Sequence, residues 1–163
     1  MFEILTPDEY YQNIFDINLS RLKKEGIKGI ICDIDNTIVP YKKKIINEKI
    51  KEWFVETRQK NLKVCLLSNG LNNRIKYFSK KMDLPAVESA GFKPGKKVYE
   101  KAVNILNLNK KEIVVIGDQI FTDVLGGNRT GLKTILVNPI SKDEFIFTKM
   151  VRKIEKCIFE RKY

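Results

Sequence analysis

Four continuous apolar runs are the clearest pattern along the chain. They span Ile27–Asp33, Leu62–Ser68, Glu112–Asp118 and Lys133–Asn138. A run without polar residues at every second position is typical of a strand that is covered on both faces. A weaker run, Pro85–Ser89, predicts a further strand at a sheet edge.

Between these runs, apolar residues recur at spacings of three and four, which predicts amphipathic helices. The helical segments are Asn47–Gln59, Asn72–Met82, Lys96–Asn107 and Ile120–Asn128. Strands that alternate with helices indicate a parallel sheet. We therefore expect an α/β fold, a doubly wound Rossmann-like three-layer α/β/α sandwich with about five mostly parallel strands.

Two capping boxes predict helix starts near the ends of this pattern, Thr6-x-x-Glu9 and Ser141-x-x-Glu144. The chain shows no internal repeat, low-complexity tract or linker. Its 163 residues therefore predict one domain that spans residues 1–163.

Composition narrows the chemistry that the chain can perform. It has no histidine, which excludes Ser-His-Asp and Cys-His nucleophiles and histidine-based zinc hydrolases. Its three cysteines form no Cys-x-x-Cys pair and read as reduced thiols. No stretch approaches the roughly 20 apolar residues of a membrane span, and the start lacks a secretory pattern, so we expect a cytoplasmic protein.

The formal net charge of +11 favours anionic partners: nucleic acid, a phosphorylated metabolite or an acidic membrane surface. One basic cluster, Lys42 to Lys44, could steer an anionic substrate together with Arg74, Lys96 and Lys97. A second basic cluster lies in the tail beside a stripe of apolar residues. We expect this stripe to pack on the core of the domain, and peripheral contact with an anionic membrane is the alternative. The stripe contains Phe147, Met150, Val151, Ile154 and Ile158.

Three of the apolar runs end on a polar residue: Asp33, Ser68 and Asp118. The carboxyl ends of parallel strands meet at one edge of a sheet, so these three side chains should converge. Two ionised carboxylates repel each other unless a cation lies between them. Oxygen ligands and a phosphate substrate favour Mg²⁺ as that cation.

Asp35 lies two residues after Asp33, and in an extended chain both side chains would face the same way. Asp33 could attack phosphorus while Asp35 protonates the leaving group and later deprotonates water. Lys93 could neutralise the nucleophile and a phosphate oxygen together. Ser68 and the backbone N–H groups that follow Asp33 and Ser68 could bind the other oxygens.

Together these residues resemble the motifs of the haloacid-dehalogenase (HAD) superfamily of phosphatases. The four motifs occur in the family's order: Asp33-x-Asp35-x-Thr37, Ser68, Lys93, and Gly117-Asp118-x4-Asp123. The resemblance implies that Asp33 is the nucleophile and Asp35 the acid and base. It also implies Mg²⁺ ligation by Asp33, Asp118 and the Asp35 carbonyl, with Asp123 orienting a metal-bound water.

For the substrate, the resemblance implies that Ser68 and Lys93 bind phosphate. Thr37 and Asn69 adjoin these motifs and are further candidates for the phosphate site, with loop geometry as the alternative role of Thr37. Neither interval, Asp35 to Ser68 or Ser68 to Lys93, has room for the cap domain common in that superfamily. The site should therefore be open, which suits a bulky substrate.

The narrower sequence context is similar to the short subfamily IIIA branch that includes phosphatidylglycerophosphate phosphatases. The segments that carry this similarity are LTPDEYYQNIFDINL, DIDNTIVPY and GDQIFTDVLGGNRTGLKTILVNPI. It implies a lipid phosphomonoester substrate and a role in making phosphatidylglycerol. A peripheral position at the inner face of the membrane is then the alternative to a purely cytoplasmic location. Alternatives are a phosphatase for nucleic-acid ends or phosphoproteins, a signalling receiver domain, and a non-catalytic basic RNA-binding module.

Overall fold

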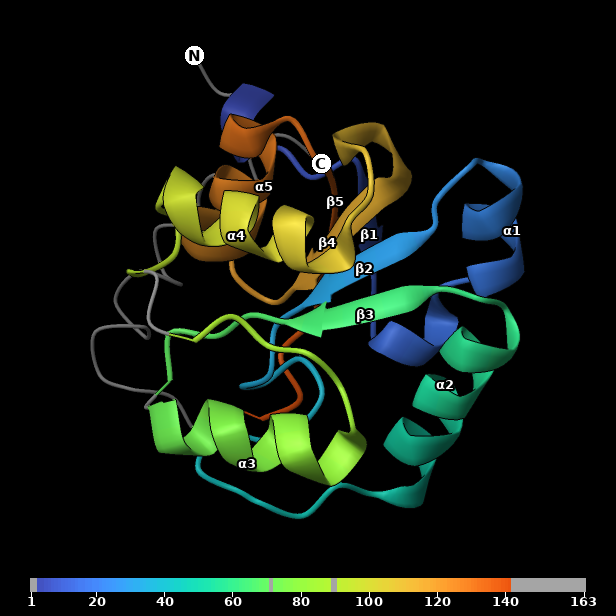
Figure 1. Cartoon of the computed structure of the whole chain (residues 1–163), viewed down its shortest axis with the longest axis vertical. Coiled ribbons are helices and arrows are strands. Elements are labelled where there is room, and N and C mark those ends of the chain that lie inside the picture. The colour runs from blue at the N-terminus through green and yellow to red at the C-terminus, as the bar shows by residue number, and fades with distance from the viewer. Residues whose placement is uncertain (1–2, 71, 89–90, 142–163) are drawn as a thin grey trace.

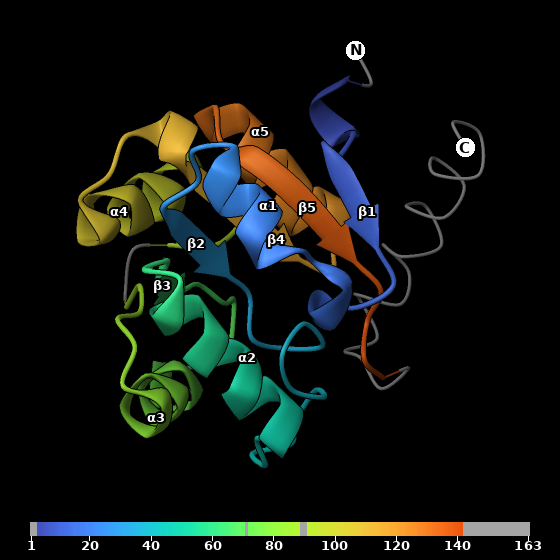
Figure 2. The same cartoon turned by 90° about the vertical axis from the view of Figure 1, so that its right-hand side faces the viewer.

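Five parallel strands form one sheet in the structure, a computed structural model that describes residues 3–70, 72–88 and 91–141. Figure 1 shows these strands, and their order across the sheet, β1-β5-β4-β2-β3, is seen in Figure 2. The strands are β1 (Glu9–Tyr11), β2 (Gly29–Cys32), β3 (Lys63–Leu66), β4 (Ile113–Gly117) and β5 (Lys133–Val137). The four strong apolar runs are thus confirmed as strands, and all residues of β2 and β4 are buried.

Helices cover both faces of this sheet (Figure 2). On one face α1 (Leu19–Lys24), α2 (Glu48–Gln59) and α3 (Asn72–Met82) pack on strand residues such as Ile30 and Val64. On the other face α4 (Lys96–Leu106) packs on Ile31 and Val115, next to α5 (Leu125–Thr130). Successive residues of β2 enter opposite cores, as the pleat requires. The predicted α/β/α sandwich is confirmed.

Short helical turns complete the described elements. Three 3-10 turns span Glu3–Leu5, Ile14–Asp16 and Lys110–Glu112. The predicted helix over Ile120–Asn128 begins as one π-helical turn, Ile120–Val124, and continues as α5. No helix in the described ranges is long and apolar enough to span a bilayer.

The predicted edge strand at Pro85–Ser89 is wrong for the part that the structure describes. Only Ala86 forms a bridge there, opposite Leu66. Two hydrogen bonds hold it, from Leu66 N to Pro85 O and from Val87 N to Leu66 O, both 2.9 Å long. Because Pro85 has no N–H, the ladder cannot extend to the residues before Ala86.

The fifth strand is instead β1, where the Thr6-x-x-Glu9 pattern predicted a helix start. That prediction is wrong because Asp8 binds across to β5: its Oδ2 accepts a hydrogen bond from Thr134 N at 2.7 Å. Glu9 then pairs in register with Ile135. In the second capping box, Ser141 donates to Asn36 Oδ1 at 2.8 Å, and Glu144 lies outside the described residues.

Charged groups hold β1 against its neighbours. Burial raises the pKa of Glu9, but hydrogen bonds from Lys133, Tyr11 and Arg21 outweigh it and lower the pKa to about 2. The folded pKa lies below the unfolded value of about 4.3, so this stabilisation is present above that value and is lost as the pH falls toward 2.

We expect Glu9→Gln to lower the free energy of unfolding at pH 7 by about 1–2 kcal/mol, a value reduced for partial solvent screening. The difference from the unmodified protein should shrink below about pH 4. Urea unfolding at several pH values measures this. Glu56→Gln is the control, because that carboxylate is half exposed and its ion pair with Lys60 is 3.4 Å long. Equal losses in the two variants would contradict the prediction.

Candidate active site

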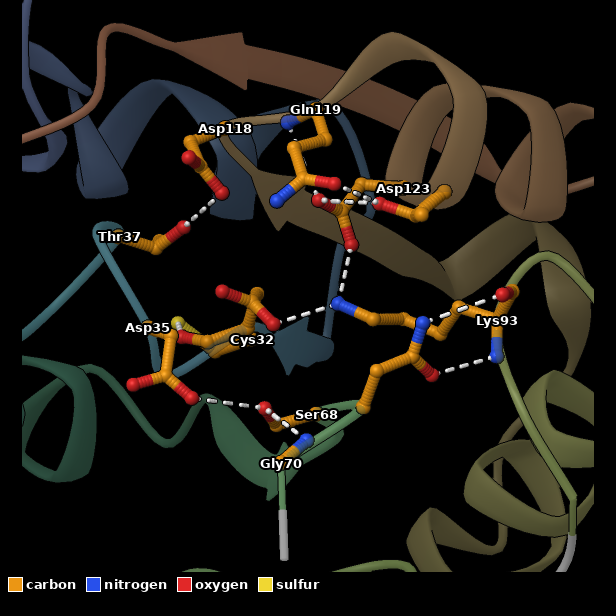
Figure 3. A network of polar contacts seen from close by, with 12 residues as sticks. Cys32, Asp35, Thr37, Ser68, Gly70, Lys93, Asp118, Gln119 and Asp123 are labelled. Atoms are coloured by element: carbon orange, nitrogen blue, oxygen red, sulfur yellow. Dashed lines mark hydrogen bonds and ion pairs between the residues drawn. The ribbon is translucent and has the colours of Figure 1, made fainter. Parts of the chain in front are cut away.

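Three strand ends converge at the carboxyl edge of the sheet. Cys32 of β2 lies beside Ile116 of β4, and Asp33 N continues the ladder by donating to Ile116 O at 3.0 Å. Asp33 and Asp118 therefore leave adjacent strands one step apart. On the other side of β2, Leu67 N donates to Cys32 O at 3.0 Å, which brings Ser68 to the same edge (Figure 3). The predicted convergence of these three residues is confirmed.

Lys93 lies among the acidic side chains. Its Nζ is 2.5 Å from Asp33 Oδ1 and 2.7 Å from Asp123 Oδ1, and the side chains of all three residues are at most 6% exposed. The backbone of Lys93 is held by Asn69, whose Oδ1 accepts from Lys93 N at 2.7 Å and whose Nδ2 donates to Lys93 O at 3.1 Å. The Asn69 side chain thus positions Lys93, and phosphate binding by Asn69 stays a prediction.

The two acidic residues of the fourth motif, Asp118 and Asp123, are held by hydrogen bonds. Thr37 is buried, and its hydroxyl donates to Asp118 Oδ1 at 3.4 Å, so this hydroxyl orients a carboxylate. Asp123 also accepts from Gln119 N at 3.2 Å. Gly117 has to be glycine here, since a Cβ on it would lie 2.1 Å from Asp123 Cγ.

Asp35 has surroundings different from those of Asp33. Its Oδ2 accepts from Ser68 Oγ at 3.3 Å, and its Oδ1 lies 2.8 Å from Arg74 Nε and 2.7 Å from Arg74 Nη2. The two ion-paired side chains are 18% and 14% exposed. The sequence had placed Arg74 among the residues that steer an anionic substrate, whereas its guanidinium binds the second acid of the first motif.

Arg74 is therefore the residue of this site that sequence reasoning missed. The available signal was its place in the first turns of the helix that follows Ser68, which brings it to the same sheet edge. Two of the other steering candidates, Lys96 and Lys97, are exposed, and Lys96 Nζ lies 3.8 Å from Glu100.

We expect Arg74→Met to lower kcat about 10- to 100-fold, because a shift of about 1 Å in a reacting group can cost that much. The kcat of Arg74→Lys should lie between those of the unmodified protein and of Arg74→Met, since one ammonium cannot replace a bidentate guanidinium. Steady-state kinetics on an aryl phosphate measures this. Arg129→Met is the control, since Arg129 is an exposed residue of α5, and unchanged kcat in Arg74→Met would contradict the positioning role.

Burial dominates the electrostatics of the nucleophile candidate. Burial raises the pKa of Asp33, Lys93 opposes this, and Asp123 and Asp118 raise it further. Cys32, next to it, is fully buried, and burial chiefly raises the pKa of its thiol, in line with a packing role. Cys65 is also a buried free thiol, while Cys157 lies outside the described residues.

The charges of this site fit a divalent cation. Three buried carboxylates, Asp33, Asp118 and Asp123, lie at this edge of the sheet with one buried ammonium, that of Lys93, which contacts Asp33 and Asp123. Two negative charges remain when all four groups are ionised. All available donors are oxygens, the ligands that Mg²⁺ prefers. Within the described residues no three acidic or sulfur side chains form a ready metal cluster. Mg²⁺ ligation by Asp33, Asp118 and the Asp35 carbonyl stays a prediction.

Comparison with known proteins places this site in context. A family model described as HAD-hydrolase-like matches residues 92–139. The chain is 41% identical to "Probable phosphatase YqeG" of Bacillus subtilis over 93% of this chain and 88% of that protein. It is 29% identical to the mitochondrial phosphatidylglycerophosphatase GEP4 of Saccharomyces cerevisiae, over 74% of this chain and 76% of the yeast protein.

A plant protein shows the same similarity over a shorter part of its length. Phosphatidylglycerophosphate phosphatase 1 of Arabidopsis thaliana is 26% identical over 98% of this chain, which covers 48% of the plant protein.

Solved structures share the fold at low sequence identity. A HAD-superfamily hydrolase from Ehrlichia chaffeensis superposes with a TM-score of 0.59 at 14% identity, over 83% of this chain and 98% of that one. The cobalt-bound deoxy-D-mannose-octulosonate 8-phosphate phosphatase of Haemophilus influenzae gives a TM-score of 0.57 at 13% identity, over 85% and 90%.

Proposed function

The chain belongs to the HAD-like hydrolases, within the YqeG-like branch, and is a phosphatase; from this premise we propose that it is a Mg²⁺-dependent phosphomonoesterase that uses Asp33 as its nucleophile. The observation that carries the proposal is the contact of buried Asp33 with Lys93 at the carboxyl edge of the sheet, where Asp118 follows the adjacent strand. A nucleophilic carboxylate splits a difficult hydrolysis into two displacements.

In the first displacement an oxygen of Asp33 attacks phosphorus, and the bond from phosphorus to the ester oxygen breaks. Asp35 gives a proton to the leaving alkoxide, which departs as an alcohol. Ser68 Oγ and Lys93 Nζ lie close enough to the two acids to donate to oxygens of the phosphoryl group. The product of this step is an acyl phosphate on Asp33.

In the second displacement Asp35, now ionised, takes a proton from water. The water oxygen attacks phosphorus, the acyl phosphate bond breaks, and Asp33 is regenerated together with inorganic phosphate. Arg74 holds Asp35 in place throughout, since two nitrogens of its guanidinium contact the carboxylate. When bound at Asp33, Asp118 and the Asp35 carbonyl, Mg²⁺ supplies positive charge to the phosphate oxygens.

The proposed substrate is a lipid phosphate such as phosphatidylglycerophosphate. Two relatives are named for this activity, and the described chain between Asp35 and Ser68 holds only a loop, α2 and β3, with no cap over the site. Hydrolysis of an aryl phosphate with Mg²⁺ tests the chemistry. Parallel assays on phosphatidylglycerophosphate, a 3′-phosphorylated oligonucleotide and a phosphopeptide test the substrate, and preference for either of the last two would overturn the lipid assignment.

The acid role of Asp35 predicts a dependence on the leaving group. We expect Asp35→Asn to slow release of an alkyl alcohol about 10²- to 10⁴-fold, and release of a nitrophenolate much less, because nitrophenolate needs little protonation. Burst-phase kinetics on both esters separates the first displacement from the second. Equal slowing of the first displacement for the two esters would exclude general-acid catalysis by Asp35.

A further inference from the structure

A basic and apolar loop lies beside the active site. Lys42, Lys43 and Lys44 are exposed and are followed by Ile45, which is 78% exposed. The next residue, Ile46, is buried. An isoleucine that is so exposed beside three lysines is not stabilised by burial within the folded chain. Such a combination is typical of a surface that contacts an anionic, partly apolar partner.

The backbone of this loop is tied down rather than free. Arg74 Nη1 donates to Lys43 O at 2.6 Å, and Tyr77 OH donates to Lys44 O at 3.3 Å. Both donors belong to α3. Since these backbone carbonyls are held against α3, the loop is fixed beside that helix, and Lys44 Nζ also lies 5.6 Å from the centre of the Tyr77 ring. Arg74 also holds Asp35, so the loop and the catalytic acid share one anchor.

A second exposed apolar side chain adjoins the same site. Phe92 is 75% exposed and immediately precedes Lys93, the lysine that contacts Asp33. It borders a hollow of about 140 Å³ together with Asn72 and Ile75 of α3. Lys96 and Lys97, which follow it, are exposed. The loop that contains Ile45 is thus bonded to α3, and Phe92 borders a hollow that α3 also lines, next to the site.

We propose that Lys42–Ile45 and Phe92, here called the docking rim, place the enzyme on the surface of an anionic phospholipid bilayer. The lysines attract the anionic headgroups, and Ile45 and Phe92 enter the boundary between headgroups and acyl chains. The substrate phosphate of a lipid would then reach Asp33 without leaving the membrane. The proposal rests on the proposed lipid substrate, although bilayer binding can be measured without catalysis.

The test is co-sedimentation of the full chain with vesicles of phosphatidylcholine alone or with added phosphatidylglycerol. We expect binding only to the anionic vesicles, and weaker binding as salt rises. Replacing Lys42, Lys43 and Lys44 by glutamine should weaken binding about 100-fold, at about fivefold per lysine. Ile45→Ser and Phe92→Ser should each weaken it about 5- to 20-fold.

Matched controls lie at the opposite edge of the sheet or on another helix. Lys23, Lys24 and Lys111 are exposed next to the starts of β2 and β4, and their replacement by glutamine removes the same charge. Val55→Ser on α2 matches Ile45→Ser, since Val55 is 47% exposed. Residues 142–163 are the same in every variant, so a difference among variants reports on the rim.

The outcomes separate this inference from the proposed function. We expect Ile45→Ser and Phe92→Ser to keep the wild-type rate on a soluble aryl phosphate while they lose vesicle binding. Equal loss in rim and control variants, wild-type binding in the rim variants, or tighter binding of an oligonucleotide than of anionic vesicles would overturn the docking rim. Absence of aryl phosphate hydrolysis in the unmodified chain would instead overturn the proposed chemistry.

Discussion

Replacing Asp33 by asparagine is expected to lower kcat on an aryl phosphate by at least about 10³-fold. The amide cannot attack phosphorus, and no other carboxylate takes its place, because Asp118 and Asp123 are held by Thr37 and Lys93. Asparagine has nearly the same shape, so loss of fold should not accompany loss of rate.

Two measurements accompany the rate. Rapid acid quenching of the unmodified enzyme during turnover should leave one phosphoryl group on the peptide that contains Asp33, and the variant should carry none. Asp83→Asn is the matched control, since Asp83 is exposed and its positive φ of 52° suits asparagine as well as aspartate. A variant at Asp33 that retains the wild-type rate would show that the nucleophile lies elsewhere.

The strands and the acidic edge could be predicted because each rests on a local pattern. A buried parallel strand needs an unbroken apolar run, and β2 and β4 have such runs, ending one step before Asp33 and Asp118. Once the strands are parallel, the geometry of the sheet alone brings these acids together. The same reasoning placed α2, α3 and α4 within one or two residues of their observed bounds.

What could not be predicted depends on contacts between distant segments. The strand β1 has only three residues and no apolar run, and the bonds of Asp8 to Thr134 and of Glu9 to Lys133 define it across more than a hundred residues. The ion pair of Arg74 with Asp35 is similar, since helical periodicity shows which face a residue is on but not which carboxylate it meets. The charge of Arg74 alone had suggested only that it steers an anionic substrate.

Lys93 carries the second large prediction. Lys93→Met should lower the free energy of unfolding in the presence of a chelator by about 3–5 kcal/mol, because Asp33 and Asp123 would be left buried without their ammonium partner. It should also lower kcat about 10²- to 10³-fold, through loss of a donor to the phosphoryl oxygens. Chemical denaturation and steady-state kinetics measure the two effects.

The response of Lys93→Met to Mg²⁺ distinguishes loss of charge compensation from simple loss of packing. If the three carboxylates form one anionic site, the cation should restore part of the stability lost in Lys93→Met and raise the unmodified protein's stability less, since its lysine already compensates one charge. Lys76→Met is the control: Lys76 is 58% exposed, lies 3.5 Å from Glu88, and should change stability by about 0.5 kcal/mol or less, with no added response to Mg²⁺. A Lys93 variant as stable as the unmodified protein without Mg²⁺ would mean that the acids at this sheet edge are not held by their ammonium partner, and the charge argument for the metal would fall with it.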